Sequence, residues 1–211
     1  MKVQRGNNMM KIVFIGDSIT DAYHNYSEDA LGEGYVKIIG DKLRNSGSEV
    51  DILNKGHDGF TVFGLWKFLD NDCISKKPDI VSILIGCNDV SIEMSTGKTL
   101  EEQEFIDYYE KILKKIIQKT DAKIICMGPF IFPHPLEFAN WIPKIKKAES
   151  MVSEIAEKYD AKFLPLHDML NEAVTSGNYG EITTDGTHLT KEGARAVAEK
   201  WLQATVNWLD K

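Results

Sequence analysis

The sequence predicts an α/β protein, a three-layer α/β/α sandwich around a central, mostly parallel sheet of five strands. Short apolar runs alternate with amphipathic helical patterns about five times along the 211 residues. This alternation is typical of parallel strands joined by helices. Polar residues follow directly after several of the apolar runs. Because parallel sheets bind ligands beyond the carboxyl ends of their strands, these polar residues are the first candidates for function.

The first half of the chain is predicted to contribute three strands and two helices. The strands are expected at 11–16, 49–54 and 78–86. The second helix is expected at 60–72. The first, expected at 33–47, ends at Gly47 and carries on one face Tyr35, Ile38, Ile39 and Leu43.

The second half is predicted to add two strands and three helices. The clearest helical pattern spans 99–120, where Thr99 and Glu102 form a capping box. Its apolar stripe consists of Phe105, Tyr108, Tyr109, Ile112, Ile116 and Ile117. Strands are expected at 122–128 and 161–166, with a helix at 143–159 between them. A final helix is expected from Lys191 to Leu209, with Thr190 as its N-cap.

The composition argues against several classes of partner. A formal net charge of −7 does not suit a nucleic-acid surface or attraction to an anionic membrane. The three cysteines are widely spaced and form no CxxC pair, which argues against a disulfide framework or a zinc site and favours a reducing compartment. Cys87 and Cys126 end apolar runs and are expected to be small buried side chains.

The length predicts one domain over 1–211, with residues 1–10 as an N-terminal extension. No apolar segment is long enough for a signal peptide or a membrane span, so we expect a cytoplasmic protein. The oligomeric state stays open, and aromatic residues such as Trp141 are candidates for a homo-oligomer interface.

Ser18 lies in "GDSITD", directly after the first predicted strand. Two interpretations remain open for this residue. A serine at this place can cap a short helix. It can also be a nucleophile, but a serine hydroxyl is weak at neutral pH and needs a neighbouring base.

A histidine must therefore supply the base, and the chain contains five. In "TTDGTHLT", His188 follows Asp185 by three residues, a spacing that brings two side chains to one face of a turn. The carboxylate can then fix one ring nitrogen and leave the other as base. The same residues also suit a capped loop before a helix. His57 and His167, which have only a sequence-adjacent aspartate, are expected to be loop or cap residues.

Acyl transfer also requires hydrogen-bond donors for the oxyanion that develops in the transition state. Asn88 in "IGCND" follows the third predicted strand, and "NKGHDGFT" supplies glycines whose backbone N–H groups can approach a ligand closely. Each of these loops taken alone is equally typical of a simple turn.

Taken together, "FIGDSITD", "NKGHDG", "IGCND" and "DGTH" resemble, in order and spacing, the SGNH hydrolase family of GDSL esterases and lipases. The resemblance extends from Ile12 to the final helix and implies a flavodoxin-like fold that uses no metal or organic cofactor. It implies that Ser18 is the nucleophile, His188 the base and Asp185 its orienting carboxylate. The implied oxyanion donors are the N–H groups of Ser18 and Gly59 and the side chain of Asn88, with Asp17 and Asp89 as supports of these loops.

Gly59 is preferred to Gly56 as oxyanion donor because the family's glycine lies five residues after the asparagine of this block, which here is Asn54. His57 lies two residues before that glycine, so its role stays open.

A narrower resemblance concerns "GDSITDAY", "LGEGYV" and "KPDIVSILIGCNDV". These stretches are similar to a branch that includes intracellular carbohydrate acetylesterases acting on acetylated xylo-oligosaccharides. The chain departs from that branch in "NKGHDGFT" and "NDVSIEM", near the expected substrate pockets. The aromatic and proline-rich segment 129–142 is expected either to wall the leaving-group site or to form an interface or cover.

The resemblance implies a serine esterase for a small-molecule ester, with O-acetyl groups on carbohydrates as the leading substrate. Lysophospholipids and acyl thioesters are the alternatives within the family. A metal-dependent phosphatase of the haloacid dehalogenase type is a further alternative, but it needs an oxygen ligand two residues after Asp17, where Ile19 stands. A non-enzymatic module of the same fold does not explain the complete Ser-Asp-His set.

Overall fold

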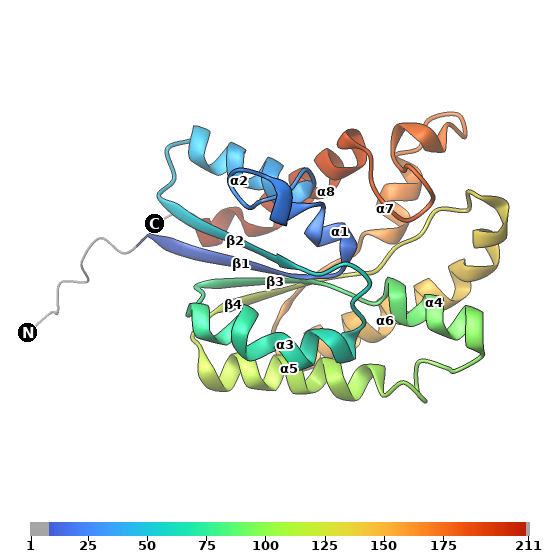
Figure 1. Cartoon of the computed structure of the whole chain (residues 1–211), viewed down its shortest axis with the longest axis horizontal. Helices are drawn as coiled ribbons and strands as arrows, with labels where there is room; N and C mark the ends of the chain where they lie inside the picture. Colours follow the sequence, from blue (N-terminus) through green and yellow to red (C-terminus); the bar gives the residue numbers. More distant parts are fainter. Residues whose placement is uncertain (1–8, 210–211) are drawn as a thin grey trace, which may run out of the picture.

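Five parallel strands form the centre of the computed structural model, which describes residues 9–209 (Figure 1). Their order across the sheet is β2-β1-β3-β4-β5, which is the flavodoxin-like order. Every strand pair is parallel, so the predicted "mostly parallel" sheet is parallel throughout. The strands are β1 (Met10–Gly16), β2 (Val50–Gly56), β3 (Ile80–Leu84), β4 (Lys123–Met127) and β5 (Lys162–Leu164).

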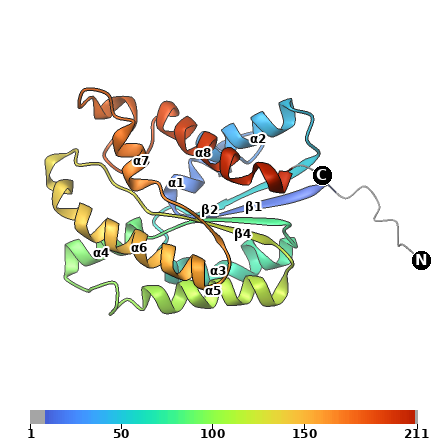
Figure 2. The same ribbon diagram turned by 180° about the vertical axis from the view of Figure 1, so that it is seen from behind.

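Helices cover both faces of the sheet, as the two opposite views show (Figures 1 and 2). One face carries α1 (Ser18–Asp21), α2 (Tyr35–Asn45), α7 (His167–Glu172) and α8 (Lys191–Leu209). The other carries α3 (Val62–Asp72), α4 (Cys87–Thr96), α5 (Phe105–Lys119) and α6 (Ile142–Lys158). Each face encloses its own hydrophobic cluster, which confirms the predicted three layers.

The apolar run of β1 is continuous because both faces of the strand are buried. Ile12 and Phe14 pack into one hydrophobic cluster, while Val13 and Ile15 pack into the other. The strand ends at Gly16, where a Cβ atom would lie 2.4 Å from the Leu84 carbonyl oxygen. A glycine is therefore required for β1 and β3 to end side by side.

The helix predicted over 99–120 begins only at Phe105. The predicted capping box does form, because the N–H of Thr99 donates to Glu102 at 2.8 Å and the N–H of Glu102 donates back at 3.2 Å. The box closes a separate turn, however, because Glu104 has a left-handed φ of 55° that interrupts the helix. On α5 itself, Leu113 is buried whereas the predicted stripe residue Ile117 is 46% exposed.

Three short helices, α1, α4 and α7, were not predicted. Each follows a strand end, and α4 occupies the stretch expected to be only a loop after β3. The helix α4 was missed because it buries a polar side chain where an apolar one would be expected. Buried Glu93 pairs with Lys144 at 2.5 Å and accepts the N–H of Leu100 at 3.1 Å. The first turn of α7 is held by Glu149, whose Oε1 accepts two backbone N–H groups.

The amino-terminal boundary lies earlier than expected. Met10 already pairs with Val50 in the sheet, so it does not belong to the predicted extension 1–10, and residues 1–8 lie outside the described part of the chain. All three cysteines are buried with free thiols. Among residues 9–209, no helix is long and apolar enough to cross a membrane.

Candidate active site

Ser18, His188 and Asp185 form one hydrogen-bonded chain. The Oγ of Ser18 lies 2.9 Å from Nε2 of His188, and Nδ1 of that ring lies 2.6 Å from Oδ2 of Asp185. A carboxylate can only accept, so Nδ1 carries the proton and Nε2 is free to accept from the serine hydroxyl. This arrangement is the one that a serine nucleophile, its base and an orienting carboxylate would require.

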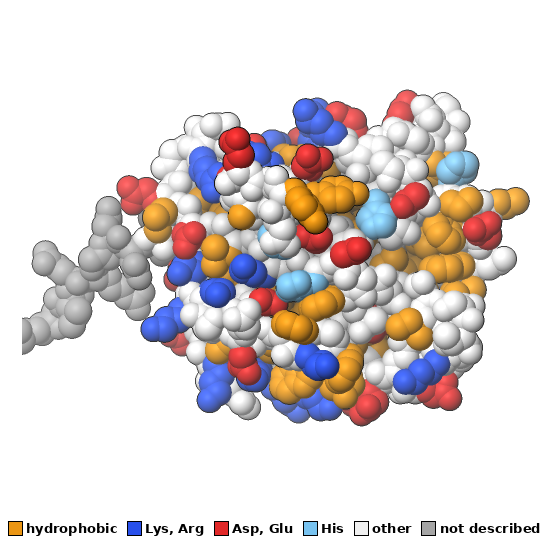
Figure 3. Space-filling view, viewed as in Figure 1, with side chains coloured by type: hydrophobic (Ala, Val, Ile, Leu, Met, Phe, Trp, Pro, Cys, Tyr) orange, Lys and Arg blue, Asp and Glu red, His pale blue; other side chains and the backbone are white. Residues whose placement is uncertain are grey.

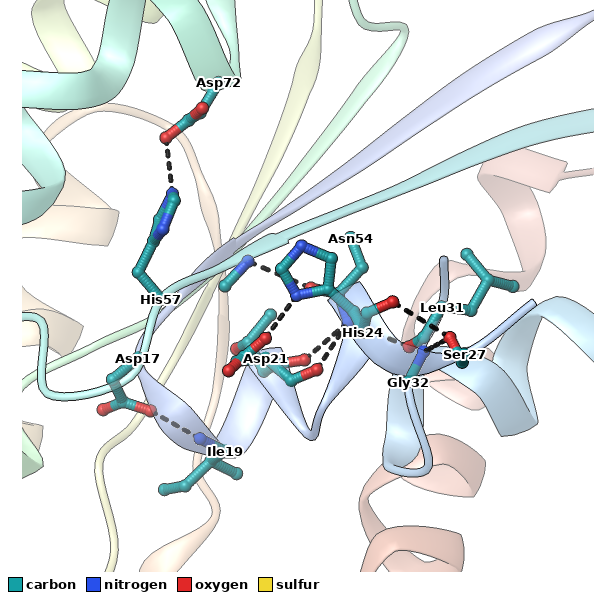
Figure 4. A network of polar contacts seen from close by, with 12 residues as sticks. Asp17, Ile19, Asp21, His24, Ser27, Leu31, Gly32, Asn54, His57 and Asp72 are labelled. Atoms are coloured by element: carbon teal, nitrogen blue, oxygen red, sulfur yellow. Dashed lines mark hydrogen bonds and ion pairs between the residues drawn. The ribbon is translucent and has the colours of Figure 1, made fainter. Parts of the chain in front are cut away.

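Ser18 is the first residue of α1, at the carboxyl end of β1. The cap of this helix is Asp17, whose Oδ1 accepts the N–H of Ile19 at 3.0 Å (Figure 4). The alternative interpretation of Ser18 as the helix cap is therefore wrong. Because the neighbouring aspartate performs that task, the serine hydroxyl is left for His188.

Asp185 and His188 lie in a loop that holds both side chains in place. Oδ1 of Asp185 accepts the N–H groups of Thr187 and His188 at 2.9 and 2.7 Å. Partial burial raises the pKa of Asp185, but the hydrogen bonds from the side chain and backbone of His188 outweigh this, and the net pKa lies below its usual value. The carboxylate thus stays ionised and favours the Nδ1–H tautomer of His188.

The segment 129–142 packs against the loop that carries Asp185 and His188. The N–H of Phe132 donates to the carbonyl of Gly186 at 2.9 Å, and Phe130, Ile131 and Phe132 are buried in the core. Gly186 has a φ of +94°, and a Cβ atom there would lie 2.1 Å from the carbonyl oxygen of His134. Of the alternatives for this segment, a wall of the site and an interface are therefore wrong for residues 130–132, which support the loop that carries Asp185 and His188.

The predicted oxyanion donors converge at the same edge of the sheet. Nδ2 of Asn88 donates one hydrogen to the Phe60 carbonyl at 2.9 Å, which fixes the amide and leaves its second hydrogen for a ligand. The N–H of Gly56 is already bonded to Asn54 Oδ1 at 3.0 Å. Within residues 9–209, no protein acceptor is bonded to the N–H of Ser18 or Gly59, which favours Gly59 over Gly56 as donor.

Asp17 and Asp89 are both buried next to the segments that carry the candidate donors. Each holds the first turn of a helix, since Asp17 caps α1 and both carboxylate oxygens of Asp89 accept the N–H of Val62 at 3.2 Å. Asp89 thus ties the first turn of α4, which carries Asn88, to the start of α3, which follows the Gly59 loop.

Asn54 is a structural residue of the site whose role was not predicted from the sequence. Its Nδ2 lies 2.7 Å from the carbonyl oxygen of Thr20 and 2.9 Å from that of Leu31, so it ties β2 to α1 and the following loop. Asparagine is disfavoured inside strands, and its place within a predicted strand was the available signal.

Two further histidine–aspartate pairs lie near the site (Figure 4). His24 bonds Asp21 through Nδ1. This pair was not predicted, although Asp21 and His24 in "DAYH" have the same three-residue spacing as Asp185 and His188. His57 points away from that pair and bonds Asp72 at 2.8 Å, so the expectation that it lacks an orienting carboxylate is wrong.

His167 is a buried side chain in the first turn of α7 and not the loop or cap residue that was expected. Its Nδ1 accepts the N–H of Ile131 at 3.4 Å, and burial lowers its pKa. A neutral ring that accepts a backbone N–H in the core is not available as a base for Ser18, which His188 already contacts.

Comparison with known proteins identifies the family. A model of the GDSL-like lipase/acylhydrolase family matches residues 14–196. The chain belongs to this family. It is 31% identical over 216 residues to an acetylxylan esterase of Geobacillus stearothermophilus, covering 96% of this chain and 95% of that one. An acetylxylan esterase of Xylanibacter ruminicola is 28% identical over 90% of this chain and 42% of its own length.

Solved structures support the assignment of this chain to the GDSL-like lipase/acylhydrolase family. A protein described as a GDSL-like lipase from Parabacteroides merdae superposes with a TM-score of 0.85 at 26% identity, covering 94% of this chain and 96% of that one. The Geobacillus acetylxylan esterase superposes with a TM-score of 0.81 at 28% identity, covering 92% and 93%. Three solved catalytic mutants of that esterase replace a serine, an aspartate and a histidine, the last two being three residues apart. The family and these relatives make the present protein a carboxylic ester hydrolase.

The candidate nucleophile of this hydrolase, Ser18, lines a large surface hollow of about 1230 Å³. Ser18, His188 and His57 lie along it, and on the face seen in Figure 3 histidine side chains lie among acidic and apolar ones. Tyr23 and Tyr26 line it as well and are 68% and 89% exposed. The hollow is far larger than an acetyl group, so most of its volume is available to the alcohol part of an ester.

The buried carboxylate of Asp17 makes the stability of the hydrolase depend on pH. Burial raises the pKa of Asp17 from 3.8 to about 7, although the hydrogen bond from Ile19 opposes this. Asp17 therefore ionises at a higher pH in the folded protein than in the unfolded chain. Its contribution to the free energy of unfolding is lost as pH rises from about 4 to 7. We expect Asp17→Asn, whose Oδ1 still caps α1, to gain stability relative to the parent by up to roughly 4 kcal/mol between pH 4 and pH 8.

Urea unfolding at several pH values measures this gain. Asp107→Asn, at an exposed position in the first turn of α5, is the matched control and should show no such pH-dependent difference. A constant difference between Asp17→Asn and the parent at all pH values would contradict the raised pKa.

Proposed function

We propose that this hydrolase cleaves small carboxylic esters through a covalent acyl-enzyme on Ser18, and that O-acetyl groups on carbohydrates are its substrates. The observation that carries the mechanism is the chain from Ser18 through His188 to Asp185, with contacts of 2.9 and 2.6 Å. No metal or organic cofactor takes part in the proposed steps.

In the first half-reaction, Ser18 Oγ bonds to the ester carbonyl carbon while His188 Nε2 takes the hydroxyl proton. The tetrahedral intermediate then breaks its bond to the alcohol oxygen, which leaves with the proton from His188. In the second half-reaction, a water molecule gives its proton to His188 and its oxygen attacks the acyl group on Ser18. The carboxylic acid is released and the serine hydroxyl recovers its proton.

The developing oxyanion is proposed to receive hydrogen bonds from the N–H groups of Ser18 and Gly59 and from Asn88 Nδ2. These donors suit the task because two are backbone groups and the third is fixed by the Phe60 carbonyl. Such pre-oriented donors stabilise the transition state without a reorganisation cost.

We expect Asn88→Ala to lower kcat by about 10²–10³-fold with a smaller change in KM, because its amide binds charge that exists only in the transition state. Steady-state kinetics on one soluble ester measures the split. An effect confined to KM would place Asn88 in substrate binding instead.

The names of the relatives and the shape of the hollow support a carbohydrate as the alcohol part. The backbone that carries Tyr23 is well defined, because Ala22 and Tyr23 both have left-handed φ values of 41° and 62° and the Ala22 carbonyl accepts the N–H of Glu33 at 2.8 Å. Exposed tyrosine rings can stack on the apolar faces of sugar rings, and Glu33 and Asp58 in the hollow can accept hydrogen bonds from sugar hydroxyls.

A substrate panel tests this proposal. We expect kcat/KM to be highest for acetylated xylo-oligosaccharides and to fall along p-nitrophenyl esters of increasing chain length, acyl-CoA and lysophospholipid. Tyr23→Ala should lower kcat/KM on the acetylated sugar about fivefold, from roughly 1 kcal/mol of lost stacking area, and leave p-nitrophenyl acetate almost unchanged. Leu136→Ala, at an 82% exposed position outside the hollow, is the matched control.

A preference for lysophospholipid or acyl-CoA would favour the family's alternative activities. The haloacid dehalogenase alternative is disfavoured because Ile19, at the required ligand position, is buried in the hydrophobic core. We also propose a cytoplasmic location, which the three free, buried thiols support.

A further inference from the structure

We propose that His57, held by Asp72, is a positioning residue for the oxyanion hole. The inference rests on the proposed function, because it concerns the same developing charge. Nothing in the proposed steps uses this histidine, yet it borders the hollow beside Ser18 and carries its own buried carboxylate.

The His57 side chain is held by a hydrogen bond from one ring nitrogen and by stacking of its ring face. Nε2 donates to Oδ2 of Asp72 at 2.8 Å, and Asp72 is only 6% exposed at the end of α3. The other oxygen of Asp72 accepts Nδ2 of Asn71 at 3.0 Å, so the carboxylate itself cannot swing freely. The ring face of His57 stacks on Phe60 with centroids 4.3 Å apart and an angle of 21°.

These contacts lead directly to the proposed donors. The backbone of His57 is anchored by its N–H to the Gly16 carbonyl at 3.0 Å, and its own carbonyl accepts the N–H of Phe60 at 3.2 Å. The carbonyl of Phe60 in turn accepts Nδ2 of Asn88 at 2.9 Å. One continuous series of contacts thus runs from Asp72 through the ring of His57 and the backbone of Phe60 to the Asn88 amide.

The loop between β2 and α3 needs such support at this point. Gly59 is exposed, has a φ of +71°, and has no atom within 4 Å of where its Cβ would lie. The direction of its N–H is therefore set by its neighbours rather than by packing on the glycine itself. His57 and Phe60 flank it, so the stacked pair determines where both Gly59 and Asn88 point.

Loss of the His57 imidazole should destabilise the transition state more than the substrate complex. Phe60 loses its stacking partner, its carbonyl moves, and the Asn88 amide loses its fixed orientation toward the oxyanion. A displacement of about 1 Å in a catalytic group can cost on the order of 10²-fold in rate. We therefore expect His57→Ala and Asp72→Ala to lower kcat by about 10- to 100-fold while KM changes less than about threefold.

His57→Gln separates positioning from mere volume. Its terminal amide reaches about as far as Nε2 and can donate to Asp72, so we expect it to retain kcat within about fivefold of the parent. Asp70→Ala is the matched control, since Asp70 is exposed, lies two residues away on the same helix and accepts a hydrogen bond from Lys115 Nζ at 2.6 Å. It should leave kcat and KM unchanged.

The decisive measurement is coupling with Asn88. If His57 acts through that amide, His57→Ala should lower kcat by less than about threefold in an Asn88→Ala background, because contacting residues are not additive. This cycle is measured on p-nitrophenyl acetate with variants whose melting temperature exceeds the assay temperature, and it does not require Asp72→Ala to fold.

Equal losses in both backgrounds, an effect on KM alone, or His57→Gln as poor as His57→Ala would overturn the inference. Its failure is distinguishable from failure of the proposed function. Labelling of Ser18 by a fluorophosphonate with loss of activity in Ser18→Ala supports the acyl-enzyme whatever His57 does, whereas an active Ser18→Ala would overturn both.

Discussion

Ser18→Ala is expected to lower kcat by about 10³-fold or more while the fold survives, because the covalent route is lost with the hydroxyl. Ser18 is only half-buried, and its Oγ bonds His188. Its removal therefore takes away the nucleophile without opening a cavity in the core, so circular dichroism and the melting temperature should match those of the parent.

Chemical labelling provides an independent reading of the same prediction. A fluorophosphonate probe should label Ser18 and no other serine, as peptide mass spectrometry would reveal. Ser150→Ala, at an exposed position on α6, is the matched control and should keep both labelling and activity. Near-normal activity of Ser18→Ala would show that the nucleophile lies elsewhere.

His188→Ala is expected to have an effect of similar size, because no other side chain among residues 9–209 forms a hydrogen bond with Ser18 Oγ. Asp185→Asn should also lower kcat, by at least about 10²-fold, because an amide can donate to Nδ1 and so favour the wrong tautomer. His167→Ala should keep most of the activity, because its ring accepts a backbone N–H in the core.

The dependence on pH has a defined sign. Only a neutral imidazole can take the serine proton, so kcat/KM of the parent should be lower at acidic pH than at neutral pH. The hydrogen bonds that hold the pKa of Asp185 below its usual value keep this carboxylate ionised over the same range. If His167→Ala were as damaging as His188→Ala, the assignment of the base would be wrong.

The fold was largely predictable because its strands and long helices follow simple hydrophobic periods. Buried β1 appears as an unbroken apolar run, and α8 has the predicted bounds with Thr190 Oγ1 accepting the N–H of Gly193 at 3.2 Å. The errors occur where polar groups are buried or where the backbone turns left-handed. Glu93 in α4 looks like a surface residue in sequence, and Glu104 breaks a helix that the apolar pattern continues through.

For the candidate site, the sequence alone pointed to Ser18, Asp185 and His188. It did so because a nucleophile at a strand end is recognisable locally, and because Asp185 and His188 are close enough in the chain to meet within one loop. Their order and spacing also carried the family resemblance. Only the tertiary structure brings Ser18 to His188, which lies 170 residues further along the chain.

The tertiary structure alone decided the supports of the site. The bond from Asn54 to Leu31 spans 23 residues, that from His57 to Asp72 spans 15, and the one from Phe132 to Gly186 joins two loops distant in sequence. None of these contacts leaves a periodic pattern or a short motif, because each depends on how the fold brings together loops, strands and helix ends that are separate in the sequence. Local sequence determined which groups carry the chemistry, whereas packing between distant segments determined how they are held.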